Sequence, residues 1–152
     1  MDLGLRDRVA LVAASSQGLG RACALELARE GAQVVICGRR DGRLSEAAGQ
    51  IRAATGSQVL PLRADLTDAA QIEHLVSETM RRYERIDVLV TNNGGPPAGF
   101  FDDFADDAWL KAHQLTLLSA VRLIRAVLPA MRAQKWGRIV NITSVSVKQP
   151  ID

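Results

Sequence analysis

RVALVAASSQGLGRACALELARE, residues 8–30, carries the strongest structural signal in the chain. It opens with an apolar run of strand length, residues 9–14, and closes with residues 19–29, whose Ala, Leu, Glu and Arg favour a helix. The turn between them consists of small residues, so a ligand could approach its backbone while the helix directs free N–H groups toward it. Glycines alone are weak evidence, because Gly18 and Gly20 would also suit a tight connection without a ligand.

Short apolar runs alternate with helical patterns along the rest of the chain. Because parallel neighbours need crossover helices, this alternation predicts an α/β fold, a Rossmann-type doubly wound parallel sheet in a single domain over residues 1–152. Asp68 and Gln71 predict a capped start for the third helix. Beyond 9–14, strands are predicted at 33–38, 58–63, 86–91 and 138–142. After the helix at 19–29, helices are predicted at 42–55, from the cap at Asp68 through the apolar positions 72–83, and at about 106–134.

Composition narrows the classes of partner. The 19 basic and 17 acidic residues are spread through the chain, which argues against a nucleic-acid surface or a polybasic membrane patch. No uninterrupted apolar run reaches the roughly 20 residues of a membrane span, and no signal sequence opens the chain, so we expect a cytoplasmic protein without a membrane partner. The cysteines Cys23 and Cys37 and the histidines His74 and His113 are unclustered, so neither a disulfide nor a metal site is expected.

The predicted helix at 106–134 is apolar on more than one face. A surface helix needs a single apolar stripe, so a second face needs a second cover. Another subunit or a later part of the fold would provide it, and we favour a homo-oligomer formed through this helix. Pro129 is expected to kink or end the helix near its last turn. The apolar residues are Leu110, Leu115, Leu117, Leu118, Val121, Leu123, Ile124, Val127 and Leu128.

The end of the second strand indicates which dinucleotide the turn would hold. An acidic residue there would accept hydrogen bonds from both hydroxyls of an adenosine ribose, but this chain has Gly38, Arg39 and Arg40. A pair of guanidinium groups suits a 2′-phosphate, which favours NADP(H) over NAD(H). The alternative is that one or both arginines are solvated loop residues.

These features resemble the short-chain dehydrogenase/reductase family, in particular the 3-oxoacyl-acyl-carrier-protein reductases and related carbonyl reductases. The resemblance covers the whole chain as the amino-terminal part of such an enzyme. It implies hydride transfer between NADPH and a small carbonyl or alcohol substrate. Its landmarks are the turn ASSQGLG, Asp65 and Leu66, LVTNNGG after the fourth strand, LPAM at residues 128–131 and GRIVNITS at residues 137–144.

The resemblance also implies a role for each residue of these motifs. Gly18 and Gly20, with Leu19 between them, would face the cofactor pyrophosphate. Ser15 and Ser16 would bind cofactor phosphate or ribose.

Further along the chain, Arg39, with Arg40 beside it, would take the 2′-phosphate. Asp65 and Leu66 would flank the adenine, and Asn92 and Gly94 would border the cofactor. Ser144 would be the catalytic serine that donates a hydrogen bond to the substrate carbonyl.

Several residues depart from the family pattern. Ala13 and Ala14 stand where the family has Thr and Gly, so a methyl group would intrude beside the cofactor. Asn93 replaces a small alanine and Thr91 an asparagine, and Thr116 takes the place of the asparagine on the catalytic helix. The loop at 92–101, NNGGPPAGFF, would serve either as a substrate-side lid or as a stiff connector.

The family's tyrosine and lysine would fall at positions 157 and 161, outside residues 1–152. Lys148 and Tyr83 are poor substitutes for that acid pair, and losing a general acid costs about 10² to 10⁴ in rate. We therefore expect a domain that is incomplete after its fifth strand and has little activity by itself. The alternative hypothesis is an inactive nucleotide-binding or structural, oligomerising relic.

Overall fold

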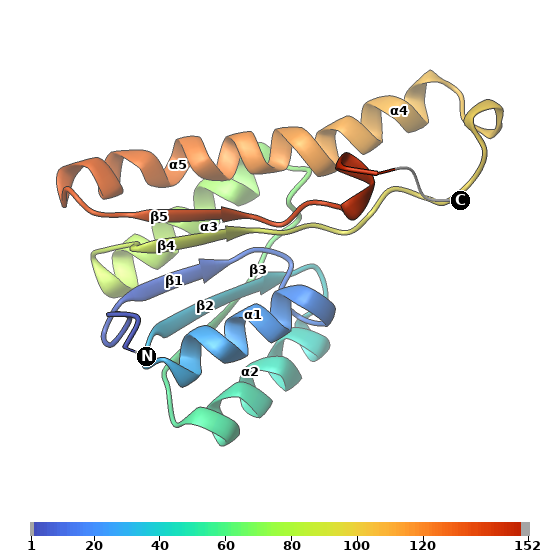
Figure 1. Cartoon of the computed structure of the whole chain (residues 1–152). Coiled ribbons are helices and arrows are strands. Elements are labelled where there is room, and N and C mark those ends of the chain that lie inside the picture. Colours follow the sequence, from blue (N-terminus) through green and yellow to red (C-terminus); the bar gives the residue numbers. More distant parts are fainter. Residues whose placement is uncertain (1, 150–152) are drawn as a thin grey trace.

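The computed structural model describes residues 2–149, which form a five-stranded parallel sheet with helices on both faces (Figure 1). The strands are hydrogen-bonded in the order β3-β2-β1-β4-β5. This order confirms the Rossmann-type doubly wound sheet, in which β1 and β4 are neighbours at the point where the strand order reverses. The strands are β1 (Val9–Val12), β2 (Gln33–Gly38), β3 (Val59–Arg63), β4 (Val88–Thr91) and β5 (Arg138–Asn141).

Alternate residues of the strands supply separate cores on the two faces of the sheet. Val12 and Ile36 pack with α1 (Gly18–Arg29) and α2 (Asp41–Thr55) on one face. Leu11 and Leu89 pack with α3 (Ala69–Tyr83) and α5 (Ser119–Ala133) on the other. The central strands are therefore mostly apolar, as expected for a parallel sheet covered on both sides.

The predicted start of α3 is confirmed at atomic detail. The Asp68 carboxylate accepts hydrogen bonds from the N–H groups of Ala70 (2.9 Å) and Gln71 (3.4 Å), and the Gln71 side chain donates back to it at 2.9 Å. These donors hold the pKa of Asp68 below its ordinary value. The cap fixes where the chain turns from β3 into α3, beside the carboxyl end of the sheet.

The predicted helix at 106–134 is one 28-residue helix over Asp106–Ala133, but its middle is not α-helical. It consists of α4 (Asp106–His113), the π-helical segment η2 (Gln114–Leu118) and α5. Of the two outcomes expected at Pro129, an end of the helix is not observed, because α5 continues to Ala133 and Met131 packs into the core, whereas the kink stays a prediction. Figure 1 shows α4 reaching beyond the ends of the strands.

By length and composition, Asp106–Ala133 could cross a membrane. This differs from the expectation that no stretch was long and apolar enough, because the structure makes one helix of segments that Arg122 and Arg125 interrupt in the sequence. In this fold Leu123 and Val127 pack into the core and Arg122 donates to the Thr67 carbonyl at 2.9 Å. A helix that covers a sheet satisfies the same test of length and composition.

The helix keeps an apolar surface away from the sheet. Leu110, Leu117 and Val121 are exposed, whereas Leu123 and Val127 are buried. The second apolar face predicted from the sequence is therefore present.

At the amino-terminal ends of the strands, a buried carboxylate joins β1 to β4. The Asp87 side chain is fully buried. It accepts hydrogen bonds from Val9 N (2.9 Å), from Arg8 Nη1 (3.1 Å), and from Nε (2.7 Å) and Nη2 (2.6 Å) of Arg85. Arg8 also lies over the Trp136 ring, 4.1 Å from its centroid. Burial opposes ionisation of Asp87, but these donors outweigh it and hold its pKa below the ordinary value.

Candidate functional site

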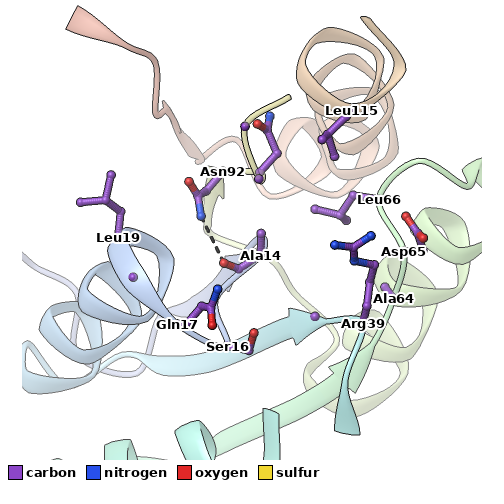
Figure 2. Close-up of a pocket in the computed structure, with 15 residues that line it drawn as sticks. Ala14, Ser16, Gln17, Leu19, Arg39, Ala64, Asp65, Leu66, Asn92 and Leu115 are labelled. Carbon is purple, nitrogen blue, oxygen red and sulfur yellow. Dashed lines mark hydrogen bonds between the residues drawn. The ribbon is translucent and has the colours of Figure 1, made fainter. Parts of the chain in front are cut away.

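A cavity of about 350 Å³ lies at the carboxyl ends of the strands, over the junction of β1 and β4 (Figure 2). In an open α/β sheet this is where ligands bind, because the connections on either side leave in opposite directions. The residues predicted from the sequence that border it are Ser16, Gly18, Leu19, Arg39, Asp65, Leu66, Asn92 and Gly94.

The turn after β1 forms one wall of the cavity. Gln17 precedes α1 with extended backbone and forms no side-chain cap within the described part of the chain. The first N–H groups of α1 therefore remain available beside Gly18, which has a φ of 57°. Such an N-terminus carries partial positive charge and suits a phosphate group.

Ala14 borders the cavity in a conformation that side chains disfavour. Its φ is 45°, in the left-handed region. The Ala14 carbonyl accepts a hydrogen bond from the Asn92 side chain at 3.2 Å, drawn in Figure 2. Asn92 thus ties the end of β4 to the turn after β1, and the Ala14 residue lies at the cavity wall, as its motif position predicts.

The role predicted for Ser15 is wrong. Its side chain is fully buried and its Oγ donates to the Val12 carbonyl at 2.6 Å while accepting from Cys37 N at 3.0 Å. Ser15 therefore joins the ends of β1 and β2 and lies outside the cavity lining.

Burial also raises the pKa of the neighbouring Cys37 thiol to about 11, so this thiol is neutral near neutral pH.

Gly20 also differs from its predicted role, because it faces the protein. A Cβ at this position would lie 2.5 Å from the Ala14 carbonyl oxygen and 2.7 Å from Asn92 Nδ2. Its lack of a side chain lets α1 pack closely on the turn and on Asn92, and it does not border the cavity. Gly18 and Gly20 thus have different tasks: Gly18 is open to the cavity and Gly20 provides packing space.

The structure separates the two arginines at the end of β2. Arg39 lines the cavity, and Figure 2 shows it across from Ser16 and Gln17. Arg40 directly precedes α2 and is absent from the described cavity lining, so only one of the two predicted arginines borders the cavity. Arg43 was not predicted as a site residue; its guanidinium group donates to the Gln17 side chain at 2.7 Å and so connects α2 to the turn after β1.

The segments after β3 and β4 close the cavity. Asp65 Oδ1 accepts from the N–H (3.0 Å) and hydroxyl (2.8 Å) of Thr67, so its carboxylate is held at the cavity edge beside Leu66. On the β4 side, Gly94 and Gly95 leave open space around their backbone.

Asn93 connects the loop after β4 to the π-helical segment. Its side-chain amide donates to the Thr116 carbonyl at 3.3 Å, while the Thr116 hydroxyl donates to the Ala112 carbonyl at 2.8 Å. A π-helical turn changes the carbonyl pattern of its helix and is frequent at functional sites. The two positions noted as departures from the family pattern are therefore in contact with each other.

Ser144 lies outside the cavity lining described by the structure. It precedes η3 (Val145–Val147) and its Oγ accepts from Ser146 N at 3.2 Å and from Ser146 Oγ at 2.7 Å. Its hydroxyl hydrogen remains able to donate to a substrate. Tyr83 lies on α3, where burial raises its pKa.

Several lining residues were not predicted. Gln17 lies inside the turn ASSQGLG and Gly95 inside LVTNNGG, so their positions in these motifs were the available signal. Ala64 and Leu115 look like core residues in the sequence and only the fold shows that they face the cavity. The unpredicted lining residues are Gln17, Gly38, Ala64, Asn93, Gly95 and Leu115.

Comparison with known proteins gives consistent matches. The family model described as short chain dehydrogenase matches residues 8–152. The uncharacterized oxidoreductase YvaG of Bacillus subtilis (strain 168) is 36% identical over 152 residues, covering 99% of this chain and 56% of that protein. A 3-oxoacyl-[acyl-carrier-protein] reductase of Synechocystis sp. is 33% identical over 142 residues, covering 93% of this chain and 58% of that protein.

A solved structure agrees with these matches. L-sorbose reductase from Gluconobacter frateurii, complexed with NADPH and L-sorbose, superposes with a TM-score of 0.95 at 33% identity, covering 99% of this chain and 57% of that one. The chain thus spans little more than half the length of the curated relatives it matches.

Proposed function

The chain belongs to the short chain dehydrogenase family, and on this premise we propose that its cavity binds NADP(H) as the cofactor site of an oxidoreductase acting on small carbonyl or alcohol substrates. The single observation that carries this proposal is the convergence of four strand ends, an uncapped helix N-terminus and Arg39 on one cavity. A dinucleotide needs such a combination of phosphate site and extended cleft.

The residues present fit this cofactor. The N–H groups at Gly18 and Leu19 would bind the pyrophosphate, and Ser16 would donate a hydroxyl hydrogen bond beside them. Arg39 would pair with the 2′-phosphate, while Asp65 and Leu66 would flank the adenine. NAD(H) is the weaker candidate, because Gly38, Arg39 and Arg40 at the end of β2 include no carboxylate to accept hydrogen bonds from a ribose.

When bound, the nicotinamide would supply the hydride. Ser144 would hold a substrate carbonyl by donating its hydroxyl hydrogen, since its acceptor side is already engaged by Ser146. Protonation of the carbonyl oxygen needs an acid, and Tyr83, the one tyrosine of the printed sequence, lies on α3. We therefore expect residues 1–152 to bind cofactor with little or no turnover by themselves.

The experiment is a calorimetric titration of the chain with NADPH and NADH, repeated with Arg39→Ala and Arg40→Ala. Each charge-assisted bond contributes about 1.5 to 3 kcal/mol, so we expect Arg39→Ala to weaken NADPH binding by roughly tenfold or more without weakening NADH binding. Arg40→Ala is the matched control and should leave the preference in place. Failure to bind either dinucleotide would contradict the proposal.

A second candidate is a nucleotide-binding relic without turnover, favoured by the position of Ser144 outside the described cavity lining. A carbonyl-reduction assay under NADPH saturation, carried out on a longer chain whose further residues supply the acid, separates the two candidates. Only the oxidoreductase hypothesis predicts turnover in that assay. We also propose, for either candidate, a cytoplasmic homo-oligomer formed through the exposed apolar face of the helix at 106–133.

A further inference from the structure

A second cavity, of about 210 Å³, lies between the loop after β4 and the helix α4. Its described lining consists of Pro, Gly, Ala, Phe and Trp, without a charged side chain. Phe100 and Phe101 are each 81% exposed and Trp109 is 50% exposed, so aromatic surface is presented to the outside rather than packed into the core. Exposed aromatic surface around a hollow is typical of a ligand site.

A hydrogen bond and ring packing hold the loop after β4 against the helix at 106–133. The Asn93 side chain anchors its start to the Thr116 carbonyl, and Phe100 N donates to the Asp103 carboxylate at 2.7 Å. The rings of Phe101 and Trp109 pack 5.5 Å apart at 55°. These contacts favour the stiff-connector hypothesis over a lid, because the aromatic wall is already formed.

A glycine makes the cavity wall possible. A Cβ on Gly99 would lie 2.6 Å from the ring of Phe104, so a side chain at this position would push that ring away from the loop. The shape of the cavity is thus built into the sequence of the loop.

The aromatic cavity adjoins the proposed cofactor cavity along both of its walls. Gly95 borders the first cavity and the next residue, Pro96, borders the second. On the helix, Ala112 lines the second cavity and Leu115, about one turn later, lines the first. A molecule that placed a polar group near the cofactor site could therefore extend an apolar group into the aromatic cavity.

We propose that this cavity binds the aromatic ring of an aryl ketone or aldehyde substrate. This inference rests on the proposed function, because it names the substrate class of the same site. An apolar cavity of about 150 Å³ accommodates benzene, so 210 Å³ holds one ring with a short substituent. The Phe and Trp walls favour an aromatic occupant through edge-to-face and offset stacking.

Trp109 provides a direct readout of occupancy. In ¹H–¹⁵N spectra of the full chain, the indole N–H signals of Trp109 and Trp136 are distinguished by a Trp136→Phe variant. Trp136 lies beside Arg8 and Arg138 near the other end of the sheet and serves as an internal reference. Acetophenone is the probe, cyclohexyl methyl ketone tests an alkyl ring of similar size, and acetone tests the carbonyl group alone.

We expect acetophenone to shift the Trp109 signal in a saturable manner and to leave the Trp136 signal unchanged. Acetone should produce no saturable shift, and cyclohexyl methyl ketone should bind several-fold more weakly. Filling the cavity with Ala112→Leu should reduce acetophenone affinity at least tenfold. Ala133→Leu adds the same atoms at an exposed site near the helix end and should change nothing.

The inference is overturned if the Trp109 shift does not saturate, if the cyclohexyl ketone binds as well as acetophenone, or if the cavity-filling variants leave affinity unchanged. Ala108→Leu is the second filling variant in case Ala112→Leu does not fold, which the Trp136 signal reports. NADPH titration is a separate measurement. NADPH binding without an acetophenone response refutes this inference alone, whereas an acetophenone response without NADPH binding refutes the cofactor proposal.

Discussion

At the scale of single residues, Ala14 is the most strained position of the candidate site. Its φ of 45° costs an L-residue about 1 to 2 kcal/mol, and glycine adopts this region without that cost. Glycine also has more freedom in the unfolded chain, which offsets about 0.5 to 1 kcal/mol of the gain. We predict that Ala14→Gly raises the free energy of unfolding by about 0.5 to 1 kcal/mol in urea denaturation, and that NADPH binding becomes no weaker.

Ala13→Gly is the matched control for this prediction. Ala13 is fully buried and has no positive φ, so the same atomic change removes packing and adds unfolded-state entropy without relieving strain. It should destabilise the chain. If both variants destabilise it equally, the strain assigned to Ala14 is incorrect.

The sequence predicts which residues surround the site better than it predicts their tasks. Arg39 and Leu66 are placed correctly because each follows a strand whose carboxyl end is predictable. Ser15 and Gly20 are not, because they lie in the same small-residue turn as Ser16 and Gly18, and only the backbone geometry shows which of them faces inward. The positive φ of Ala14 is likewise not predictable, because alanine is not a residue type that favours the left-handed region.

At the scale of elements, the helix at 106–133 shows what a pattern of apolar residues can and cannot predict. The excess of apolar positions correctly indicates a second apolar face. The π-helical segment Gln114–Leu118 is not predictable from this pattern, because a single wide turn alters the spacing too little to register. Strand β1 ends at Val12 rather than Ala14, and the left-handed conformation of Ala14 interrupts the extended backbone that a strand needs.

The exposed face of this helix carries the prediction about self-association. Leu117 and Val121 lie one turn apart and are exposed, and burying such side chains contributes about 1.5 to 3 kcal/mol each. We predict that the double variant Leu117→Glu, Val121→Glu weakens self-association at least tenfold, because two charges would enter an apolar interface. Sedimentation equilibrium over a range of concentrations measures the effect.

Ala133→Glu is the control, since it places a charge on an exposed part of the same helix away from Leu117 and Val121. It should leave the association constant unchanged. A chain that remains monomeric at every concentration tested, or a double variant that associates as strongly as the parent, would contradict self-association through this face.

At the scale of the whole molecule, the fold follows from the alternation of strand and helix patterns, and the two ends of the sheet have different tasks. The carboxyl ends form the cavity, whereas the amino-terminal ends are joined by the Asp87 network. This network is not predictable from the sequence, because Asp87 resembles an ordinary charged residue before an apolar strand. Its contact with Arg8 is apparent only once β1 and β4 are known to be neighbours, and Arg85 is then the second arginine that donates to it.

Asp87 provides a prediction about stability and its pH dependence. Removing one partner of a buried ion pair costs about 3 to 5 kcal/mol, and the partial exposure of Arg8 and Arg85 reduces this, so Asp87→Asn should cost about 2 to 3 kcal/mol at pH 7. The folded pKa of Asp87 is lowered, so its stabilisation is complete above the unfolded value of about 3.9 and is lost as pH falls through the folded pKa.

Denaturant unfolding of parent and variant at a series of pH values tests this directly. The difference in unfolding free energy should be constant near neutral pH and shrink as the pH falls below about 4. Asp107→Asn is the control, because Asp107 pairs with Lys111 at an exposed site, 2.9 Å apart, where solvent screens the pair and its loss should have little effect on stability. A cost at Asp87 no larger than at Asp107, or one that grows toward acid pH, would mean that the carboxylate does not hold β1 and β4 together in its charged form.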